Sequence, residues 1–402
     1  MTFNNICNEL DKIENSNESD ILSWSVSNIF KKECKYRVDK QINLVFKKFF
    51  KDKLSEEGLM YFINNYFDFS EKELNIIINK LIAFKSINQI IRNESELLSV
   101  IITTYNRSKF LIEAVDSVLR QSYKNIEIII MDDCSDDGTD EIIKSRYSNK
   151  KIKYYKSDKN MGPGLNRLKA FNEYAKGKYV VFMDDDDFFI DKRYFEKAVS
   201  IHEYYKNISF VAADTFVEKK ENKEMELMEL NLFGEIRKES YFLFFQSYEY
   251  PKPSSTFTAV FKREILDKVN MGKMQLLNDS TIYLRSILGG NPFFLDNIVG
   301  VYRIHGNNIT FNCSLEFILD NLNEKIDIHT ISKKLLNISD KDGDKWIIDQ
   351  IDKTIFYYLR NSNPKIKDYI GLLRWIEKLE DKYKINIRKR IIKFYIRKLI
   401  LG

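Results

Sequence analysis

Four consecutive carboxylates, Asp184 to Asp187, directly follow a short apolar run, Tyr179 to Met183. This run is rich in β-branched and aromatic residues and contains no turn residue, which predicts a strand buried on both faces. Four like charges so close together repel one another, and partial burial would raise their pKa values. A divalent cation relieves that repulsion, and Mg²⁺ typically binds one or two carboxylates together with substrate phosphates. Taken alone, the tetrad is equally compatible with a solvated acidic turn.

Further polar residues follow other apolar runs. Asp132 and Asp133 come directly after the run Ile126 to Met131, and Tyr105 follows the run Leu98 to Thr104. Helical patterns separate the runs, and this alternation with continuously apolar strands predicts a mostly parallel α/β sheet that is covered on both faces. Ligands of such sheets bind beyond the carboxyl ends of the strands, so we expect these side chains to converge with the tetrad.

The surrounding elements divide the chain into three parts. Residues 1–95 show no strand pattern and are expected to form a helical extension, whose clearest helix, Glu71 to Ile91, begins with a capping box. Residues 96–312 form the predicted α/β domain. Residues 313–402 return to a helical pattern and end in a basic tail, whose last 21 residues contain eight Lys or Arg and no acid.

The second half of the α/β domain has a different pattern. A charged segment is expected to cross the surface, and an alternating stretch and a longer apolar stretch are expected to be strands on either side of a short helix. These segments are, in order, Glu218 to Glu229, Ser254 to Phe261 as a strand, Asp279 to Leu288 as the helix, and Phe293 to Ile304 as a strand.

The composition narrows the class of protein. A net charge of +5 does not call for a nucleic-acid partner. Four scattered cysteines without a C-x-x-C pair favour neither a zinc site nor a disulfide framework, and they suit a reducing compartment. The N-terminus has acidic residues and no apolar core, so we expect no signal peptide. No stretch reaches the roughly 20 apolar residues of a membrane span. These features together predict a cytoplasmic protein.

Three motifs resemble a known family. They read S-V-I-I-T-T-Y-N-R from residue 99, I-I-I-M-D-D-C-S-D-D-G-T from residue 128 and Y-V-V-F-M-D-D-D-D from residue 179. In this order and at these separations they are similar to the family 2 glycosyltransferases with the GT-A fold, over roughly residues 97–310. The resemblance implies an inverting transferase that uses a nucleotide-diphosphate sugar, here a UDP-sugar, and usually Mg²⁺ or Mn²⁺.

The resemblance also implies roles for single residues. Thr103 and Tyr105 match positions that line the base and ribose pocket. Asp133 matches the carboxylate that accepts a hydrogen bond from the uracil imide, a role that selects uridine over cytidine. Arg167 lies where the family often has an arginine near the diphosphate, and its planar fork suits phosphate oxygens. The structural alternative for Asp133 is an aspartate that caps a helix or a turn. The alternative for Arg167 is an arginine exposed to solvent.

Within the tetrad, Asp186 is expected to be the direct metal ligand, while Asp184 and Asp185 face the ribose or metal-bound waters. Asp279 matches the second member of the family's acidic pair, the general base that takes the acceptor proton. The first member is replaced here by Asn278, and capping of the helix is the alternative role for both. His305 lies in a segment that resembles one closing over the diphosphate, where a neutral imidazole can add a metal ligand.

The acceptor is left open between two classes. Many relatives build cell-surface polysaccharides, glycolipids or teichoic acids, and we favour such a glycan slightly. The long N-terminal extension would suit a peptide or protein acceptor, as in bacteriocin-modifying members. The basic tail is expected either to contact the inner membrane face peripherally or to form a solvated final helix. A nucleotidyltransferase is a remote alternative, because it would need a glycine-rich loop after the first strand, and residues 103–107 contain no glycine. A catalytically inactive binding module is also remote, because it would not need the intact aspartates.

Overall fold

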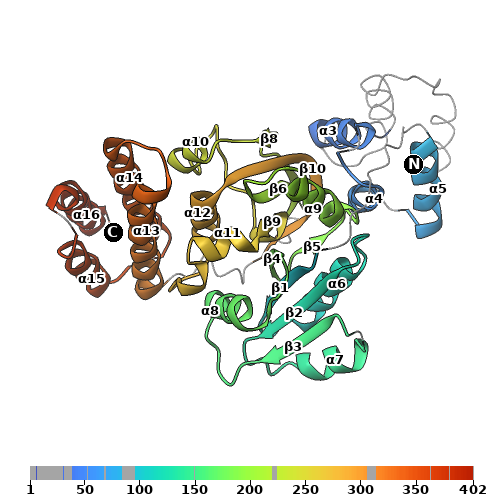
Figure 1. The fold of residues 1–402 in the computed structure, drawn as a ribbon, viewed down its shortest axis with the longest axis horizontal. Helices are drawn as coiled ribbons and strands as arrows, with labels where there is room; N and C mark the ends of the chain where they lie inside the picture. Colours follow the sequence, from blue (N-terminus) through green and yellow to red (C-terminus); the bar gives the residue numbers. More distant parts are fainter. Residues whose placement is uncertain are drawn as a thin grey trace.

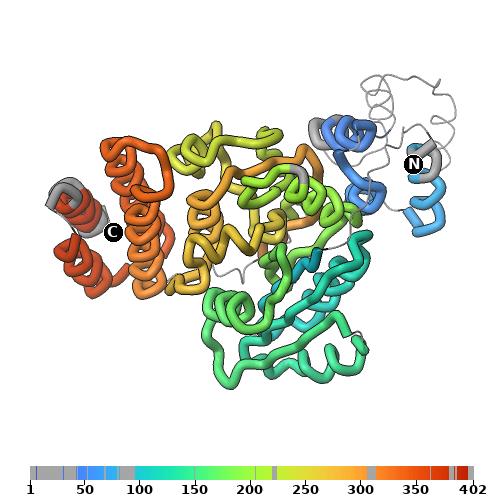
Figure 2. Tube along the Cα trace, viewed as in Figure 1, coloured from blue at the N-terminus to red at the C-terminus, as the bar shows by residue number. Residues whose placement is uncertain are grey.

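The computed structural model describes residues 6, 30, 39–51, 53–67, 69–83, 96–148, 150–219, 224–305, 314–362, 364–379 and 381–401. A ten-stranded sheet lies in the middle of the molecule. Helices near the N-terminus lie at one end of this sheet, and helices near the C-terminus lie at the other (Figure 1). The Cα trace in Figure 2 shows the same separation, from blue at one end to red at the other.

The first half of the sheet is parallel, as the sequence predicts. Its strands lie in the order β3, β2, β1, β4 and every neighbouring pair is parallel. Their bounds are β1 Leu98–Thr104, β2 Ile126–Asp132, β3 Ile152–Lys156 and β4 Tyr179–Asp184. Strands β1 and β2 are buried along their whole length, as expected for strands covered on both faces.

Connecting helices cover both faces of this parallel half. Val100 and Ile102 of β1 belong to a core cluster with residues of α6 and α9, whereas Ile101 belongs to a cluster on the opposite face. This division follows from the two-residue period of a strand. The helices and short turns are α6 Ser108–Leu119, α7 Thr139–Arg146, α8 Pro163–Lys169, the π-helical turn Ala170–Tyr174 and α9 Tyr194–Tyr204.

The second half of the sheet is mixed. Strand β9 is antiparallel to both β4 and β6, and β10 runs parallel to β6. The strands are β5 Phe188–Phe189, β6 Ile208–Lys219, β7 Glu224–Met228, β8 Gly234–Glu235, β9 Ala259–Lys262 and β10 Asn291–Ile304. The α/β class is therefore confirmed, with antiparallel strands added beyond β4.

Two segments of this half differ from the sequence predictions. The charged segment expected to cross the surface contains β7, which pairs antiparallel with β6. The strand expected from Ser254 begins only at Ala259, because residues Thr256–Thr258 form a 3₁₀ turn in which the Thr258 N–H donates to the Ser255 carbonyl over 3.4 Å. The residues of this turn are all buried and alternate between polar and apolar types. A strand has the same sequence pattern, so the prediction placed the start of the strand too early.

Gly177 lets the start of β4 approach β1 closely. Its N–H donates to Ser99 Oγ over 2.7 Å. A Cβ atom at this position would lie 2.6 Å from the Ser99 backbone nitrogen, which is closer than real Cβ contacts. The pairing of Leu98 with Tyr179 begins immediately afterwards, so this glycine permits the spacing of the two central strands.

The described N-terminal residues form three helices, α3 Asp39–Phe50, α4 Glu56–Tyr66 and α5 Glu71–Ala83. The predicted capping box is present at α5, where the Ser70 N–H donates to Glu73 Oε2 over 2.9 Å and the Glu73 N–H donates to Ser70 Oγ over 3.4 Å. The remainder of the helix expected up to Ile91 lies outside the described residues.

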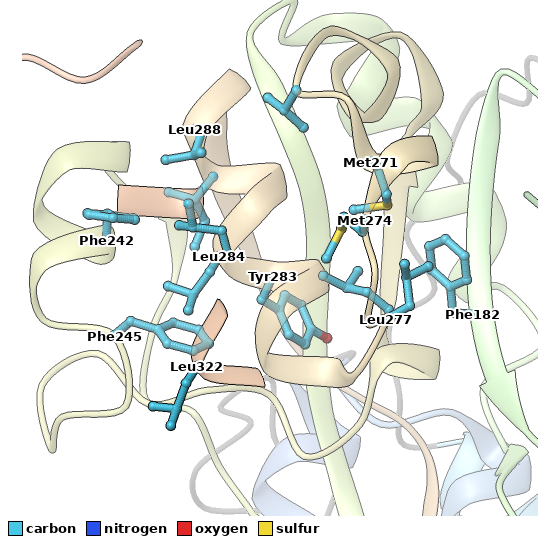
Figure 3. Close-up of a cluster of buried hydrophobic side chains, with 14 of the residues drawn as sticks. Phe182, Phe242, Phe245, Met271, Met274, Leu277, Tyr283, Leu284, Leu288 and Leu322 are labelled. Atoms are coloured by element: carbon cyan, nitrogen blue, oxygen red, sulfur yellow. The ribbon is translucent and has the colours of Figure 1, made fainter. Parts of the chain in front are cut away.

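The C-terminal helices are α13 Leu315–Leu335, α14 Asp340–Asn361, α15 Ile366–Ile376 and α16 Asp381–Leu401. They share one core cluster with α10 Lys238–Leu243, α11 Arg263–Lys268 and α12 Asp279–Gly289; the 3₁₀ turn Met271–Lys273 follows α11. Figure 3 shows Tyr283 and Leu284 of α12 near Phe245 and Leu322 in this cluster. Among the described helices, none combines the length and the hydropathy that crossing a membrane requires.

Candidate active site

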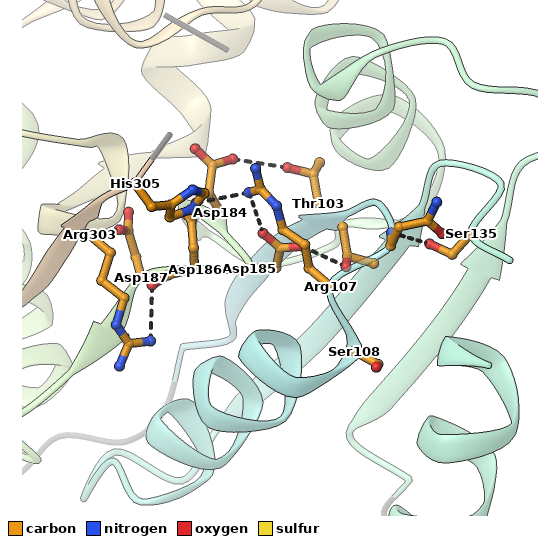
Figure 4. A network of polar contacts seen from close by, with 12 residues as sticks. Thr103, Arg107, Ser108, Ser135, Asp184, Asp185, Asp186, Asp187, Arg303 and His305 are labelled. Carbon is orange, nitrogen blue, oxygen red and sulfur yellow. Dashed lines mark hydrogen bonds and ion pairs between the residues drawn. The ribbon is translucent and has the colours of Figure 1, made fainter. Parts of the chain in front are cut away.

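The carboxyl ends of β1 and β4 bring threonines and aspartates together. The parallel register pairs Thr103 with Asp184. Thr103 Oγ1 donates to Asp184 Oδ1 over 3.1 Å, and Thr104 Oγ1 donates to Asp185 Oδ2 over 2.7 Å (Figure 4). Adjacent parallel strands end at the same sheet edge, so residues 81 positions apart in sequence become neighbours here.

Two arginines pair with the tetrad from different sides. Arg167 of α8 donates to Asp184 Oδ1 over 2.5 Å. Arg107, which follows β1, places Nη1 3.2 Å from Asp185 Oδ1 and 2.8 Å from Asp186 Oδ2. Both guanidiniums present donors in a geometry that also fits phosphate oxygens. The acidic tetrad is therefore surrounded by cationic groups at its open edge.

Asp187 is completely buried, as Asp185 and Asp186 nearly are, and its partners distinguish it from the other three aspartates. Its carboxylate accepts hydrogen bonds from Ser255 Oγ over 3.0 Å and from the Arg303 backbone N–H over 3.2 Å. Burial, and next the charge of Asp186, raise the pKa of Asp187 well above its usual range. These contacts indicate a structural role, in which Asp187 fixes the turn between β4 and β5.

Burial and mutual repulsion also act on the two middle aspartates. Burial, and then the charge of Asp186, raise the pKa of Asp185 to about 7, against the opposing effect of Arg107. The pKa of Asp186 is raised by burial first and then by Asp184. A bound cation would stabilise the ionised form of these carboxylates, because it offsets their mutual repulsion.

Asp186 and His305 form the pair expected to bind a metal ion. His305 Nε2 lies 2.9 Å from Asp186 Oδ2, and both side chains are largely buried. The Asp186 carboxylate is the type of oxygen ligand that Mg²⁺ and Mn²⁺ bind together with phosphates and water. The imidazole of His305 is a softer ligand, so the pair fits Mn²⁺ better than Mg²⁺. Within the described residues, no three His, Cys, Asp or Glu side chains gather as a complete protein-only metal site.

Asp279 lies at the first turn of α12, next to the tetrad. Asn278 is the N-cap, and its Oδ1 accepts from the Thr281 N–H over 2.9 Å in a capping box. The asparagine therefore takes the capping role, and the Asp279 carboxylate instead faces Arg167 Nη1 at 3.4 Å and Lys252 Nζ at 3.9 Å. Arg167 thus contacts both Asp184 and Asp279, which places the proposed base beside the proposed diphosphate site.

The structure does not bring Asp133 or Tyr105 into contact with the tetrad. The Asp133 carboxylate is 3% exposed and accepts from the backbone N–H groups of Met161 over 2.7 Å and Gly162 over 2.8 Å. It therefore holds the loop that precedes α8. Tyr105 is half-exposed at the end of β1. The turn-capping alternative is found at Asp132, whose Oδ1 accepts from the Ser135 N–H over 2.8 Å. Asp137 accepts from the Thr139 N–H over 3.2 Å at the start of α7.

Three cationic residues of the site had no role in the sequence analysis, namely Arg107, Lys252 and Arg303. Arg107 lies in the first motif, so its position two residues after Tyr105 was a usable signal. Arg303 lies two residues before His305, in the segment used for that histidine, so its position was a signal as well. Lys252 gave no signal, because its partner Asp279 is distant in sequence. Arg303 donates from Nη1 to the Asp186 carbonyl over 3.2 Å and from Nε to Glu218 over 2.9 Å.

Comparisons with known proteins agree on the class. A family model described as "Glycosyl transferase family 2" matches residues 99–269. The chain is 28% identical over 211 residues to the GalNAc(5)-diNAcBac-PP-undecaprenol beta-1,3-glucosyltransferase of Campylobacter jejuni, covering 52% of this chain and 64% of that protein. It is 30% identical over 218 residues to an uncharacterized glycosyltransferase of Methanocaldococcus jannaschii, covering 52% of this chain and 72% of that protein.

The chain thus spans less than two thirds of the length of the Campylobacter protein, and smaller shares of several other relatives. Among solved structures, S. aureus TarS residues 1–349 in complex with UDP-GlcNAc matches with a TM-score of 0.56 at 16% identity, covering 74% of this chain and 89% of that one. The sheet and its acidic edge therefore define a glycosyltransferase of the GT-A fold. The chain belongs to glycosyltransferase family 2.

Proposed function

We propose that this glycosyltransferase moves a sugar from a UDP-sugar to an acceptor hydroxyl with inversion at the sugar carbon. The observation that carries the proposal is the position of Arg167, which is 2.5 Å from Asp184 on the metal side and 3.4 Å from Asp279 on the acceptor side. A displacement with inversion requires the base and the leaving group on opposite sides of one carbon. The Arg167 guanidinium contacts both carboxylates, which supports one site that contains the candidate base and the metal-side carboxylate, with the sugar carbon between Asp279 and the diphosphate.

In this proposal the donor binds along the edge of the sheet. Thr103 and Tyr105 border the nucleoside, and Asp184 and Asp185 face the ribose. At the β2 end, Asp133 accepts the uracil N–H in addition to the N–H groups of Met161 and Gly162, since a carboxylate can accept from more than two donors. Arg167 binds the diphosphate through its paired N–H donors. Asp133 follows β2 and Tyr105 follows β1, and β1 lies between β2 and β4, so the proposed base pocket and the metal site lie at the ends of neighbouring strands.

The metal ligands in this proposal are Asp186 and His305, whose facing atoms are 2.9 Å apart. A bound Mg²⁺ or Mn²⁺ neutralises the developing charge of the diphosphate. Asp279 accepts the proton of the acceptor hydroxyl as the new bond from that oxygen to the sugar carbon forms. The bond from the sugar carbon to the diphosphate oxygen breaks, and its electron pair leaves with the UDP.

The acceptor we propose is a cell-surface glycan or glycolipid. The support is the relation to the Campylobacter protein, whose name describes an undecaprenol-linked acceptor, and an amphipathic C-terminal surface on α16. Ile392 and Ile396 are exposed one turn apart, beside the exposed bases Arg388, Lys389 and Lys393. Exposed aliphatic side chains among lysines and arginines suit peripheral contact with an anionic membrane face.

The proposed reaction is tested with variants of two carboxylates, Asp186 as the metal ligand and Asp279 as the base. UDP release from UDP-glucose, UDP-GlcNAc and UDP-galactose is measured with and without Mn²⁺, and UDP binding is measured by calorimetry. We expect Asp186→Ala to lose metal-dependent UDP binding, and Asp279→Asn to retain UDP binding while losing transfer. Asp136→Asn is the matched control, because Asp136 is an exposed carboxylate at the same sheet edge. Full activity of Asp279→Asn would contradict the base assignment.

Membrane contact is tested by flotation with vesicles of phosphatidylglycerol and phosphatidylcholine. The wild-type protein is expected to float with the anionic vesicles, and Ile392→Ser with Ile396→Ser to remain at the bottom. Equal flotation of both proteins, or none of the wild type, would remove the membrane from the proposal.

A further inference from the structure

A loop with exposed aromatic rings lies beside Asp279. This loop, residues 244–253, follows α10 and reads F-F-Q-S-Y-E-Y-P-K-P. Tyr248 is fully exposed at 101% and Phe244 is 53% exposed. The rings of Phe244 and Tyr250 stack with centroids 6.0 Å apart and an interplanar angle of 22°. Exposed aromatic rings that cluster next to a reaction site mark a ligand surface more often than isolated apolar residues do.

Hydrogen bonds hold this loop in one shape. The Gln246 N–H donates to the Tyr250 carbonyl over 3.0 Å, and the Ser247 N–H donates to the Phe244 carbonyl over 2.9 Å. The Tyr250 N–H donates to Ser247 Oγ over 3.1 Å. Gln246 has a φ of 64°, a left-handed conformation that a residue other than glycine adopts only when its surroundings impose it. The exposed rings are therefore presented by a fixed loop.

The loop contacts the start of α12 at two points. Gln246 Nε2 donates to Ser280 Oγ over 3.3 Å, and Ser280 is the residue after Asp279. At the other end of the loop, Lys252 Nζ lies 3.9 Å from Asp279 Oδ2. The Cα atoms of Gln246 and Tyr248 are at most about 7 Å apart. The Tyr248 ring is thus within reach of a ligand that places a hydroxyl group at Asp279.

The side chains of the loop indicate the chemistry of that ligand. Residues 244–250 contain aromatic rings, an amide, a serine hydroxyl and a carboxylate, and they contain no aliphatic residue, while Pro251, Lys252 and Pro253 end the loop. A pyranose ring has an apolar face of C–H groups, which packs on an aromatic ring, and a rim of hydroxyl groups, which pair with amides and carboxylates. A lipid surface calls for the combination present on α16, namely aliphatic residues among lysines and arginines.

We propose that residues 244–250 form an acceptor subsite that binds a pyranose unit of a glycan, with Tyr248 and Phe244 as the stacking rings and Gln246 as a polar contact. This subsite rests on the proposed function, because it takes Asp279 as the group that receives the acceptor proton. It assigns carbohydrate as the acceptor class and the loop as the part of the chain that recognises it.

The test separates binding of the acceptor from chemistry on the donor. The full-length protein is applied to an array of glucose, galactose, mannose and N-acetylhexosamine oligosaccharides and, in parallel, to a peptide array. The variants are Tyr248→Ala, Phe244→Ala, Tyr248→Leu and Tyr248→Phe. The matched control is Phe233→Ala, which removes a 72% exposed ring next to β8 and the N-terminal helices, on a different part of the sheet.

We expect wild-type binding to at least one oligosaccharide and roughly a fivefold to tenfold loss in Tyr248→Ala and Phe244→Ala, the size of one aromatic contact. Tyr248→Leu should lose as much, because it keeps apolar area and removes the ring, whereas Tyr248→Phe and Phe233→Ala should stay within twofold of wild type. UDP affinity should be unchanged in all five variants.

No binding to any oligosaccharide would overturn the inference, and so would glycan binding that Tyr248→Ala leaves unchanged. Full retention by Tyr248→Leu, or a ring-dependent signal on the peptide array alone, would overturn the carbohydrate assignment. Failure of the proposed function is distinguishable, because it would be a wild-type protein that releases no UDP from any UDP-sugar, whatever the array shows.

Discussion

The helices at the two ends of the molecule contact the active site through different partners. The N-terminal helices α3 and α4 share a core cluster with Phe188, which directly follows the aspartate tetrad, and with Val301 of β10. The C-terminal helices α13 and α14 instead share a cluster with α12, whose first turn carries Asp279. Each flank therefore supports one side of the proposed chemistry, the metal side at the N-terminal flank and the base side at the C-terminal flank.

Both flanks contain a buried cation, but they differ in how many carboxylates depend on it. At the N-terminal flank, the buried Lys48 ammonium pairs with Asp214, with Asp296 at 2.8 Å and with Glu229 at 3.1 Å. At the C-terminal flank, Trp346 stacks on Phe242 of α10 with centroids 4.3 Å apart. Removing one partner of a buried ion pair is strongly destabilising, because the remaining charges stay buried without compensation. Lys48 has three carboxylate partners that are at most 30% exposed, whereas Arg285 of α12 has one buried partner, Glu324, and one that is 56% exposed. The N-terminal flank should accordingly be the more sensitive to single changes.

The largest expected difference comes from removing one buried cation at each flank. Lys48→Met leaves Asp214 buried without its cation, and we expect a loss of about 3–5 kcal/mol in the free energy of unfolding. Arg285→Met is the matched change in α12, where Glu324 is buried but Asp327 is half-exposed and remains hydrated. Urea unfolding should show the smaller loss for Arg285→Met. Equal losses would remove the distinction between the flanks.

The second expected effect is on activity. Arg303 binds Glu113 through Nη2 at 2.7 Å as well as Glu218 and the Asp186 carbonyl, and its guanidinium lies 4.3 Å over the Phe188 ring. Lysine has one cationic centre and cannot reproduce these contacts. We expect Arg303→Lys to lower kcat for UDP release by roughly tenfold to a hundredfold through displacement of the tetrad.

The control for this change is Arg374→Lys on the outer side of α15, which should keep wild-type kcat because Arg374 is exposed. Melting temperatures of both variants separate displacement of the tetrad from unfolding. Wild-type kcat in Arg303→Lys would show that the contacts of Arg303 with Glu113, Glu218 and the Asp186 carbonyl do not position the metal side.

The third prediction concerns pH and the C-terminal flank. Lys325 is buried between α13 and α14, where its Nζ donates to Thr354 Oγ1 over 2.7 Å, and burial lowers the pKa of Lys325 to about 7. In the unfolded chain this amine keeps its usual pKa of about 10.4, so between these values the unfolded state binds more protons than the folded state.

The free energy of unfolding should therefore rise from pH 7 to pH 10, with a contribution from this group of at most about 1.4 kcal/mol per pH unit. Lys325→Met should remove that contribution. The measurement is urea unfolding of both proteins across this range, and identical pH dependence in the two would contradict the prediction.

The smallest expected effect distinguishes two serine N-caps. Ser55 Oγ accepts from the Gly58 N–H over 3.1 Å at α4 and donates to the Ile190 carbonyl of the α/β domain over 2.7 Å. Ser339 Oγ caps α14 by accepting from the Asp342 N–H over 3.1 Å and has no hydrogen bond to the sheet among those described. We expect losses of about 2 kcal/mol for Ser55→Ala and about 1 kcal/mol for Ser339→Ala in thermal unfolding. Equal losses would mean that the bond to Ile190 contributes nothing.

The sequence predicted the parts of the molecule that depend on local pattern. Strands β1, β2 and β4 are continuous apolar runs, and the residues that follow them had to meet at one sheet edge because parallel strands end together. The meeting of Thr103 with Asp184 follows directly from this rule. The predicted roles of the site residues remain proposals.

The parts that were not predicted depend on long-range packing. Lys252 lies near Asp279 because the loop of residues 244–253 packs against the start of α12. The sequence around either residue does not indicate that contact. The pairing of β7 with β6 was also not predicted. Charged residues on the exposed edge strand of a hairpin have the same composition as a loop, so the sequence pattern does not separate the two. The alternating stretch before Ala259 was mistaken for a strand because a buried turn contains the same residues.

Gly177 has a consequence for how variation in this gene should be interpreted. The Cβ of any side chain at this position would lie 2.6 Å from the Ser99 backbone nitrogen and would separate β1 from β4 where the two strands begin. The aspartate tetrad lies at the other end of these strands. A missense change here would be scored in a genetic screen as loss of enzymatic activity, although the position contacts no substrate. Screens that map activity-null alleles onto this chain should therefore expect a second group of sites, at the opposite edge of the sheet from the chemistry.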